Sequence, residues 1–142
     1  MGCKQTKTSA HLEKLSLDKS KIPVYIPPLK NVGVIDVYDG DTITIAVKQS
    51  HGYYKYKVRL AGIDSPEIRT NNPREKACAI QSRDFLKSII LYKYVTIEEA
   101  FYEKYGRLCG TVMLDGKNIN EQMITQGFAV RYNGGKKQSF NK

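Results

Sequence analysis

An alternation of apolar and polar side chains between residues 42 and 61 constrains the fold more than any other feature of this sequence. The apolar positions recur with a period of two residues: Ile43, Ile45 and Val47, then Tyr54, Tyr56, Val58 and Leu60. A period of two is that of β-strands with one face in a core. The second strand has a basic outer face, because the intervening positions include Lys55, Lys57 and Arg59. The pattern predicts two strands, each with one apolar face.

Turn and cap signals place the next elements. Asp39-Gly40 is a tight-turn dipeptide and predicts a hairpin between residues 32–37 and the first alternating strand. Asn72, Pro73 and Glu75 suit the N-cap, the first and the third positions of a helix. We expect the core-facing stripe of this helix to be Cys78, Ser82, Phe85 and Ile89, and we expect the helix to end at Tyr92.

Two more strands and a second helix complete the predicted order. We expect the strands near residues 94–98 and 108–114. Asn118, Glu121 and Gly127 then mark the cap, the capping box and the end of the second helix. Five short strands interrupted by a helix favour an α+β, mainly β fold: a five-stranded Greek-key barrel of the OB type with two or three helices.

Length, charge and cysteine content limit the classes of protein to consider. The chain has 142 residues, enough for one domain with its own core. Its 23 Lys and Arg exceed its 14 Asp and Glu, and the net charge of +9 points to nucleic acid or an anionic membrane. No apolar run reaches the roughly 18–20 residues of a membrane-spanning helix. Three cysteines, far apart, exclude a disulfide framework and argue against structural zinc, so we expect a reduced, intracellular protein.

The chain divides near residue 30. Residues 1–29 contain scattered lysines, and three of the seven residues from 22 to 28 are proline. Proline at this density favours polyproline II and excludes a central strand. We therefore expect residues 1–29 to form a flexible basic tail with a proline-rich linker, and residues 30–142 to form the folded domain.

Two segments place carboxylates at turns. In Asp39-Gly40-Asp41-Thr42 a turn explains the first two residues, but an acid at Asp41 is unfavourable where an apolar strand begins. In residues 59–67, Asp64 and Glu67 flank Pro66, which fixes the backbone between them. These three acids would repel one another without a bound cation, and Ca²⁺ takes oxygen ligands of this kind. Taken alone, the segments also fit a plain turn and a solvated acidic loop.

Two arginines accompany these acids in the sequence. Arg59 lies between Val58 and Leu60 in an alternating strand, so we expect its side chain to point away from the core. Arg107 begins a strand after the turn at residues 103–106. The second arginine, taken alone, fits an ordinary surface hairpin. Two guanidinium groups together with a cation meet the needs of phosphodiester hydrolysis, because fixed positive charge stabilises the extra negative charge of the transition state.

These segments resemble the staphylococcal (micrococcal) nuclease family, the thermonucleases. The resemblance covers about residues 30–132. It rests on these motifs: Val37-Tyr38-Asp39-Gly40-Asp41-Thr42, Val58-Arg59-Leu60-Ala61-Gly62-Ile63-Asp64-Ser65-Pro66-Glu67, Lys104-Tyr105-Gly106-Arg107, Asp115-Gly116-Lys117, Asn118-Ile119-Asn120-Glu121 and Gln126-Gly127. It implies an OB-fold barrel with packed helices and calcium-dependent endonuclease activity on DNA and RNA.

The resemblance also implies a calcium site and a catalytic carboxylate. Asp41 and Asp64 match the family's calcium-binding carboxylates, and the main-chain carbonyl of Ser65 matches a third ligand. Glu67 resembles the residue regarded as general base or water-orienting group. Ser65 stands where Thr is common, a change that a backbone ligand tolerates.

The substrate-binding residues match in part. Arg59 and Arg107 resemble the two phosphate-binding arginines, and Tyr105 resembles a tyrosine that contacts the nucleotide. A later nucleotide-contacting tyrosine has no clear counterpart, since a gap-free count ends at residues 132–133 (Tyr-Asn). The family's final helix is reduced here to residues 134–137 (Gly-Gly-Lys-Lys), so the C-terminal end departs most from the pattern.

Two hypotheses from different classes remain. The favoured one is a monomeric, calcium-dependent endonuclease with DNA and RNA as substrates. The alternative is a non-catalytic OB-type module that binds nucleic acid or protein through its basic strand face and its tyrosines. A pure binder has no use for acids that face a polyanion, and this chain keeps Asp41, Asp64 and Glu67 beside both arginines.

The N-terminus carries a separate signal. Met1-Gly2-Cys3-Lys4-Gln5-Thr6 fits the N-myristoylation pattern at Gly2, and Cys3 is a natural palmitoylation site. Two acyl chains, or one with nearby lysines, anchor a protein stably to a membrane. The same residues also fit an unmodified start, so attachment to the cytoplasmic face of a membrane is one of two expectations.

Overall fold

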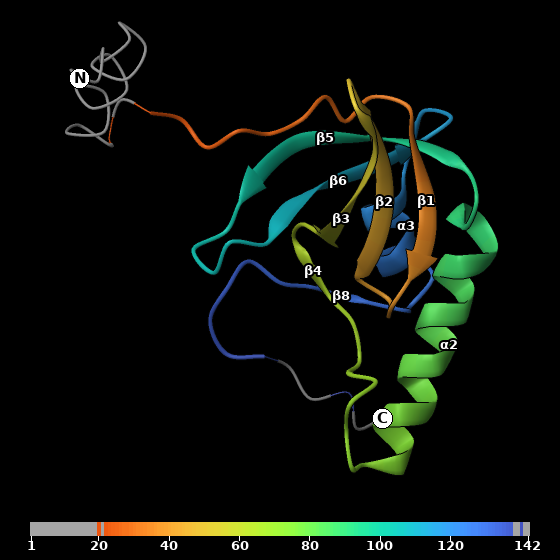
Figure 1. The fold of residues 1–142 in the computed structure, drawn as a ribbon. Helices are drawn as coiled ribbons and strands as arrows, with labels where there is room; N and C mark the ends of the chain where they lie inside the picture. The colour runs from red at the N-terminus through yellow and green to blue at the C-terminus, as the bar shows by residue number, and fades with distance from the viewer. Residues whose placement is uncertain (1–19, 21, 138–139, 141–142) are drawn as a thin grey trace, which may run out of the picture.

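A closed β-barrel forms the body of the protein (Figure 1). The computed structural model describes residues 20, 22–137 and 140. Its elements in chain order are β1 (Val32–Val37), β2 (Thr42–Gln49), β3 (Gly52–Leu60), β4 (Ile63–Asp64), α2 (Pro73–Ile90), β5 (Tyr94–Tyr102), β6 (Leu108–Leu114), β7 (Lys117–Asn118), α3 (Ile119–Thr125) and β8 (Val130–Arg131).

A parallel pairing between β3 and β6 closes the barrel. The strands follow the order β3-β2-β1-β5-β6-β7, and β3 also pairs with β6 from Val58↔Leu108 to Leu60↔Gly110. The other pairings in this sheet are antiparallel. β1, β2, β3, β5 and β6 make up the barrel, and the short β4 pairs with β8 beside it. The predicted fold, a mainly β OB-type barrel of five strands with helices, is confirmed.

The alternation in the sequence describes the barrel interior. Ile43, Ile45, Val58 and Leu60 are fully buried. The pattern weakens at the start of β3, where 49% of Tyr54 is exposed. The reason is that β6 accompanies β3 only from Val58 onward, so the first half of β3 extends past that neighbour.

Helix α2 begins where the cap signals predict it. The Asn72 side chain accepts hydrogen bonds from the backbone N–H groups of Arg74 and Glu75, with Pro73 at the first helical position. The helix ends at Ile90. Although α2 is the longest helix among the described residues, neither it nor any other helix there is long and apolar enough to cross a membrane.

The buried face of α2 differs from the predicted stripe. The residues at its centre are Ala79, Ser82, Leu86 and Ile90, whereas Cys78, Phe85 and Ile89 are only partly buried. Phe85 lies at the flank of the helix and stacks on Phe128, with ring centroids 4.4 Å apart. Ala79 is small and lies at the centre of the buried face, where it lets the helix approach the barrel. The prediction placed the larger apolar side chains at the centre and was therefore wrong about which residues are most buried.

A buried asparagine ties α3 to the barrel. Asn118 caps α3 by accepting a hydrogen bond from Glu121 N at 3.0 Å, as predicted. Asn120 accepts from Val112 N at 3.0 Å and donates to Ala61 O at 2.9 Å and Gly110 O at 3.1 Å. Its amide therefore connects α3, β6 and the end of β3.

Part of the predicted linker packs on the barrel. Leu29 is buried in the core, Ile26 packs against it, and Ile97 N donates a hydrogen bond to Leu29 O at 2.9 Å. Figure 1 shows this segment running beside β5 before it enters β1. The last residues of the range 1–29 thus contribute to the domain's packing, and the division of the chain at residue 30 stays a prediction.

Candidate active site

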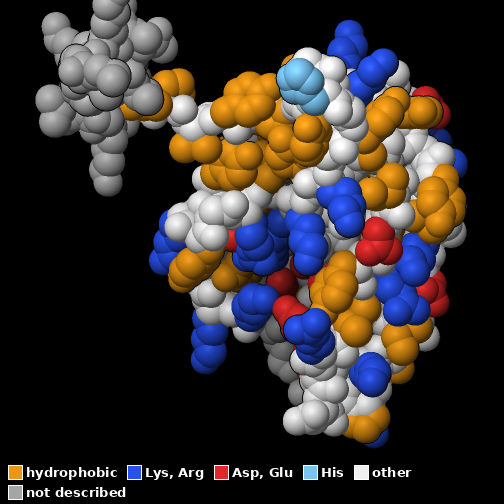
Figure 2. Space-filling model, viewed as in Figure 1, with side chains coloured by type: hydrophobic (Ala, Val, Ile, Leu, Met, Phe, Trp, Pro, Cys, Tyr) orange, Lys and Arg blue, Asp and Glu red, His pale blue; other side chains and the backbone are white. Residues whose placement is uncertain are grey.

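One cleft gathers the polar segments singled out in the sequence. It has a volume of about 1000 Å³ and is lined by the β1–β2 loop, the end of β3, β4, the β5–β6 turn and the segment after β8. Figure 2 shows acidic side chains in a hollow that Lys and Arg side chains surround. The basic residues on its walls are Lys57, Arg59, Arg69, Lys104, Arg107 and Lys137.

A buried pair of acids bridged by an arginine lies in this cleft. Asp41 and Asp64 are 6% and 2% exposed. Arg59 Nη2 donates to Asp64 Oδ1 at 3.2 Å and lies 3.6 Å from Asp41 Oδ2. One guanidinium therefore neutralises part of the repulsion between two carboxylates, which burial would otherwise make costly.

Hydrogen bonds fix the backbone around these acids. Ser65 N donates to Asp41 Oδ2 at 2.9 Å, and Leu60 N donates to Asp41 O at 2.8 Å. Asp64 is itself a strand residue, paired with Val130 in the β4–β8 ladder. Backbone hydrogen bonds thus fix Asp41 at the end of the β1–β2 loop, and the β4–β8 ladder fixes Asp64.

Gly40 brings the β1–β2 loop against neighbouring elements. A Cβ at this position would lie 2.8 Å from the Cβ atoms of both Ser65 and Ser82. The φ of Gly40 is not in the left-handed region, so the requirement here is space rather than an unusual backbone angle. The sequence correctly predicts a turn at Asp39-Gly40. It does not show that Gly40 is also needed for close packing against Ser65 and Ser82.

Asp39 has a strongly shifted pKa. Burial, followed by the negative charge of Asp41, raises the pKa of Asp39 to about 7. Asp39 Oδ1 accepts a hydrogen bond from Asp41 N at 3.0 Å. The side chain thus orders the loop that carries Asp41 and adds to the negative potential of the cleft when it ionises.

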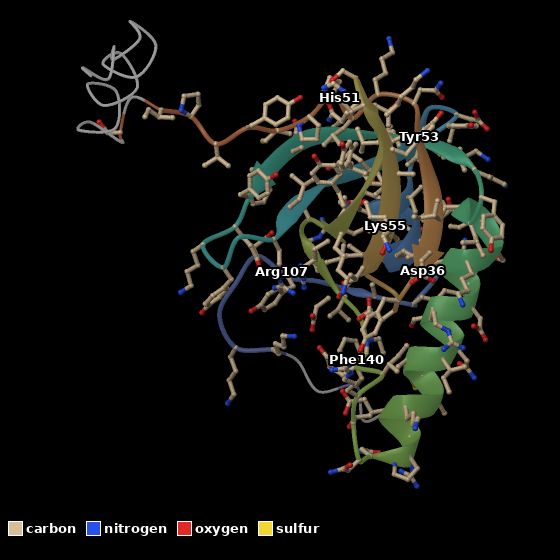
Figure 3. All side chains as sticks on the ribbon, in the orientation of Figure 1. Asp36, His51, Tyr53, Lys55, Arg107 and Phe140 are labelled. Atoms are coloured by element: carbon tan, nitrogen blue, oxygen red, sulfur yellow. The ribbon has the colours of Figure 1, made fainter. Side chains whose placement is uncertain are left out.

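Arg107 lines the same cleft and is paired with an acid of its own turn. Its Nε and Nη2 donate to the two carboxylate oxygens of Glu103, the second at 3.2 Å. Hydrogen bonding from Arg107 lowers the pKa of Glu103. Burial raises the pKa of the neighbouring Cys109 thiol. In Figure 3 the Arg107 side chain extends from the start of β6 toward the cleft.

Glu67 is connected to the acid pair through a lysine. Lys137 Nζ lies 3.3 Å from Asp64 Oδ1 and 3.5 Å from Glu67 Oε1. Partial burial acts to lower the pKa of Lys137, but the charge and hydrogen bond of Asp64 and the charge of Glu67 outweigh it, so the pKa is raised. Lys137 is therefore a fixed positive charge over the ordinary pH range.

Aromatic side chains also border the cleft. Tyr105 is largely exposed, and Lys104 Nζ lies 5.0 Å from its ring centroid. The ring of Tyr132 lies 5.9 Å from Arg59 Cζ. A cation over a ring orients both groups, and exposed rings offer faces on which nucleobases stack.

The structure brings most of the predicted site residues together. Six of them line the cleft: Asp41, Arg59, Asp64, Glu67, Tyr105 and Arg107. Ser65 is buried and contacts Asp41 through its backbone N–H. Gly2 and Cys3 lie outside the described residues.

Sequence reasoning missed three residues of the cleft. The sequence shows Glu103 only as part of a turn, and its ion pair with Arg107 depends on the shape of that turn, in which Glu103 N donates to Arg107 O at 3.0 Å. Tyr132 carries no motif that indicates its position beside Arg59. Lys137 had no local signal, because nothing in a short Gly-Gly-Lys-Lys end indicates which side chain turns back toward Asp64.

The oxygen donors around the acid pair suit a hard divalent cation. Asp41 and Asp64 supply two buried carboxylates, and Ser65 Oγ is buried without a hydrogen-bond partner among the described residues. Ca²⁺ accepts such oxygens together with carbonyls and water. In the described part of the chain, no three His, Cys, Asp or Glu side chains converge closely enough to hold a metal. Lys137 bridges Glu67 to Asp64 of this pair, and the roles assigned to the three acids stay predictions.

Comparison with known proteins gives consistent matches. Residues 57–142 match the family model described as staphylococcal nuclease homologue. An uncharacterized endonuclease of Escherichia coli is 34% identical over 100 residues, which cover 70% of this chain and 59% of that protein. One from Haemophilus influenzae is 33% identical over 99 residues, covering 70% of this chain and 51% of that protein. A probable staphylococcal-like nuclease of rice is 36% identical over 78 residues, which cover 55% of this chain and 22% of that protein.

The match includes most of the cleft but not the whole length of the relatives. This chain spans about half to three fifths of the two bacterial proteins. The family model covers more than half of this chain and takes in Arg59, Asp64, Glu67 and Arg107. The chain therefore belongs to the staphylococcal nuclease homologue family.

Proposed function

We propose that this domain is a calcium-dependent endonuclease that hydrolyses phosphodiester bonds in DNA and RNA. One observation carries the proposal. In a cleft rimmed by basic side chains, Arg59 Nη2 lies 3.2 Å from Asp64 Oδ1 and 3.6 Å from Asp41 Oδ2. Membership of the nuclease family supports it, as do the endonuclease names of the bacterial relatives. Buried acids that face a polyanion have a use in metal binding and none in simple nucleic-acid binding.

The acid pair is the part of the cleft that would hold the ion. Asp41, Asp64 and the main-chain carbonyl of Ser65 are the proposed ligands. The bound ion would supply positive charge that polarises the phosphoryl group and favours ionisation of a nearby water. Asp41 and Asp64 keep their places through Ser65 N and the β4–β8 ladder, so the ligands need little rearrangement.

The two arginines are the proposed phosphate-binding groups. A guanidinium offers two parallel donors that match two phosphate oxygens, and its charge stabilises the more negative transition state. Arg59 is held beside the acid pair, whereas Arg107 is paired with Glu103. We infer that Arg107 exchanges Glu103 for the phosphate when substrate enters, because both partners offer it two oxygens.

Glu67 and Tyr105 complete the proposed mechanism. Glu67 accepts a proton from the attacking water, or orients that water, as the water oxygen forms a new P–O bond and the P–O bond to the leaving oxygen breaks. The leaving oxygen takes a proton from the solvent. The half-exposed position of Glu67 at the cleft wall gives water access to the carboxylate. Tyr105 presents an exposed ring for stacking on a nucleobase.

Cleavage assays decide between this proposal and the binding-module alternative. Plasmid DNA, single-stranded DNA and RNA are incubated with the protein in Ca²⁺ and then in EGTA. Cleavage in Ca²⁺ that EGTA abolishes is the expected result. Retarded migration of nucleic acid without cleavage in either buffer would support the non-catalytic module, and cleavage unaffected by EGTA would exclude the calcium role.

Substitution of Glu67 tests the assigned chemistry. Glu67→Gln should raise the activation barrier by about 2–4 kcal/mol, the scale of one lost transition-state interaction, while nucleic-acid affinity changes much less. The matched control is Glu98→Gln, an exposed acid on β5. Steady-state rates and gel-shift titrations measure the two effects, and full activity of Glu67→Gln would remove Glu67 from the mechanism.

We also propose that acylation at Gly2, with Cys3 as a second site, attaches the protein to the cytoplasmic face of a membrane. The proposal is supported by the sequence Met-Gly-Cys-Lys-Gln-Thr at residues 1–6 and by the lysines that follow. Intact masses of wild type and Gly2→Ala made in a eukaryotic cell check it. Masses that differ only by the substituted residue would exclude myristate at Gly2.

A further inference from the structure

Lys137 contacts the proposed metal site without being one of its expected residues. Its Nζ lies 3.3 Å from Asp64 Oδ1, the same oxygen that accepts a hydrogen bond from Arg59 Nη2 at 3.2 Å. It also lies 3.5 Å from Glu67 Oε1. Two side-chain cations therefore share one buried carboxylate oxygen, and one of them reaches a second acid.

The two cations differ in how firmly they are held. Arg59 is a strand residue with its side chain mostly buried, and it is paired in the ladders to Thr42 and Cys109. The Lys137 side chain is 53% exposed, and Lys137 is the last residue of the continuously described range 22–137. A partly exposed ammonium on a long flexible stem is the easier of the two to displace.

A short segment after β8 delivers Lys137 to the cleft. Tyr132 anchors the start of this segment, because its N donates to Gly62 O and its hydroxyl donates to Gly135 O, both at 2.9 Å. Gly134 and Gly135 have φ of +97° and +91°, a conformation that other residues rarely adopt. The glycine turn leads the chain back toward Asp64 and Glu67, and it can release the lysine without moving the barrel.

We propose that Lys137 occupies the acid site in place of the divalent ion and competes with that ion for Asp64. The inference rests on the proposed calcium site and goes beyond it, since it assigns a cation of the chain itself to the same oxygen. In the metal-free protein, Lys137 balances the charge of Asp64 and holds Glu67 beside it. Calcium binding displaces the ammonium, which frees Glu67 and leaves a positive charge at the edge of the cleft.

Calcium titration of the full chain tests the competition directly. Isothermal titration calorimetry with Ca²⁺, without nucleic acid, compares wild type, Lys137→Gln and Lys136→Gln. Lys136 is the matched control, because it is exposed, adjacent and equal in charge. We expect the Kd for Ca²⁺ to fall about two- to fivefold in Lys137→Gln and to fall much less in Lys136→Gln, since the loss of a half-exposed ion pair has about that effect.

Thermal unfolding gives a second readout that does not depend on catalysis. In EGTA, Lys137→Gln should unfold at a lower temperature than wild type, and saturating Ca²⁺ should raise its unfolding temperature by more than it raises that of wild type. Lys137→Arg keeps a cation and should bind Ca²⁺ nearly as weakly as wild type does.

The outcomes separate this inference from the proposed function. If wild type binds Ca²⁺ and Lys137→Gln binds it no more tightly than Lys136→Gln does, the competition is refuted while the calcium site stands. If no variant binds Ca²⁺, both the calcium site and the competition are refuted. Tighter binding by Lys137→Gln alone supports both.

Discussion

Asp39 lies in the β1–β2 loop, where burial and the charge of Asp41 raise its pKa from 3.8 to about 7. A carboxyl with a raised pKa in the folded state binds a proton that the unfolded chain has already released at the same pH. The stability that this group contributes is therefore present below pH 4 and is lost as the pH rises from about 4 to about 7. Above that range Asp39 is charged in both states, and the loss is complete.

Asp39→Asn should be more stable than wild type at pH 8 in metal-free buffer, with a difference that vanishes toward pH 4. Asparagine keeps the oxygen that accepts from Asp41 N and removes the buried charge. Urea unfolding from pH 4 to pH 9 in EGTA measures the effect. Asp36→Asn, at an exposed position of β1, serves as the control, and equal stability of wild type and Asp39→Asn at pH 8 would contradict the prediction.

Individual residues differed in how much their sequence context revealed. Asp41 could be identified because an acid is out of place at the start of an apolar strand, and Arg59 because it alternates with core residues. The roles of Ser65 and Tyr105 came from the family resemblance and stay predictions. Lys137 could not be found, since its partners lie 70 or more residues away and only the folded chain brings them into contact.

The secondary structure followed local rules closely. The caps at Asn72 and Asn118 and the strand Leu108–Leu114 lie where the sequence predicts them, because capping and alternation act within a few residues. The face of α2 was predicted one position away from its true centre. Which stripe of a helix is buried depends on what it packs against, and Ala79 and Phe85 take their places from the barrel and Phe128.

Removal of Asn120 should loosen the contact between α3 and the barrel. Asn120→Ala loses one accepted and two donated hydrogen bonds and leaves Val112 N buried without its side-chain acceptor. We expect the free energy of unfolding to fall by about 3 kcal/mol or more. Chemical denaturation of this variant beside Gln122→Ala, a partly exposed residue of the same helix, measures it. A loss below that of the control would show that the amide is not structural.

At the scale of the whole molecule, charge is concentrated at the cleft. The net charge of the chain is +9, and the cleft lining brings six basic side chains together with five acids: Asp39, Asp41, Asp64, Glu67 and Glu103. The net positive charge of the whole chain attracts polyanions from a distance, and this attraction weakens as salt screens it. Under the proposed function, we expect nucleic-acid binding to depend on the whole cleft wall and the proposed chemistry to depend on a few groups at its floor.

Binding of a labelled single-stranded oligonucleotide in EGTA should weaken linearly on a log–log plot against salt concentration. Lys57→Gln, at an exposed position of the cleft wall, should reduce the magnitude of the slope by about 0.7, the value for one phosphate contact on a single strand. Lys117→Gln changes the same charge on β7, a strand outside the cleft lining, and should leave the slope unchanged. Equal slopes for all three proteins would mean that nucleic acid does not contact this wall.

The sequence by itself determined the local elements, the mainly β barrel class and, through motif spacing, the family. The local elements depend on contacts between near neighbours, so a linear pattern carries them, whereas the order and spacing of the motifs indicated the family. The resemblance implied that Arg59 and Arg107 serve one site, but only the tertiary structure showed how distant residues converge. The parallel β3–β6 pairing sets Arg59 opposite Cys109 and so brings Arg107 to the cleft, and the segment after β8 turns Lys137 onto Asp64. Both contacts join parts of the chain that no short pattern relates, because barrel closure is a cooperative property of all the strands.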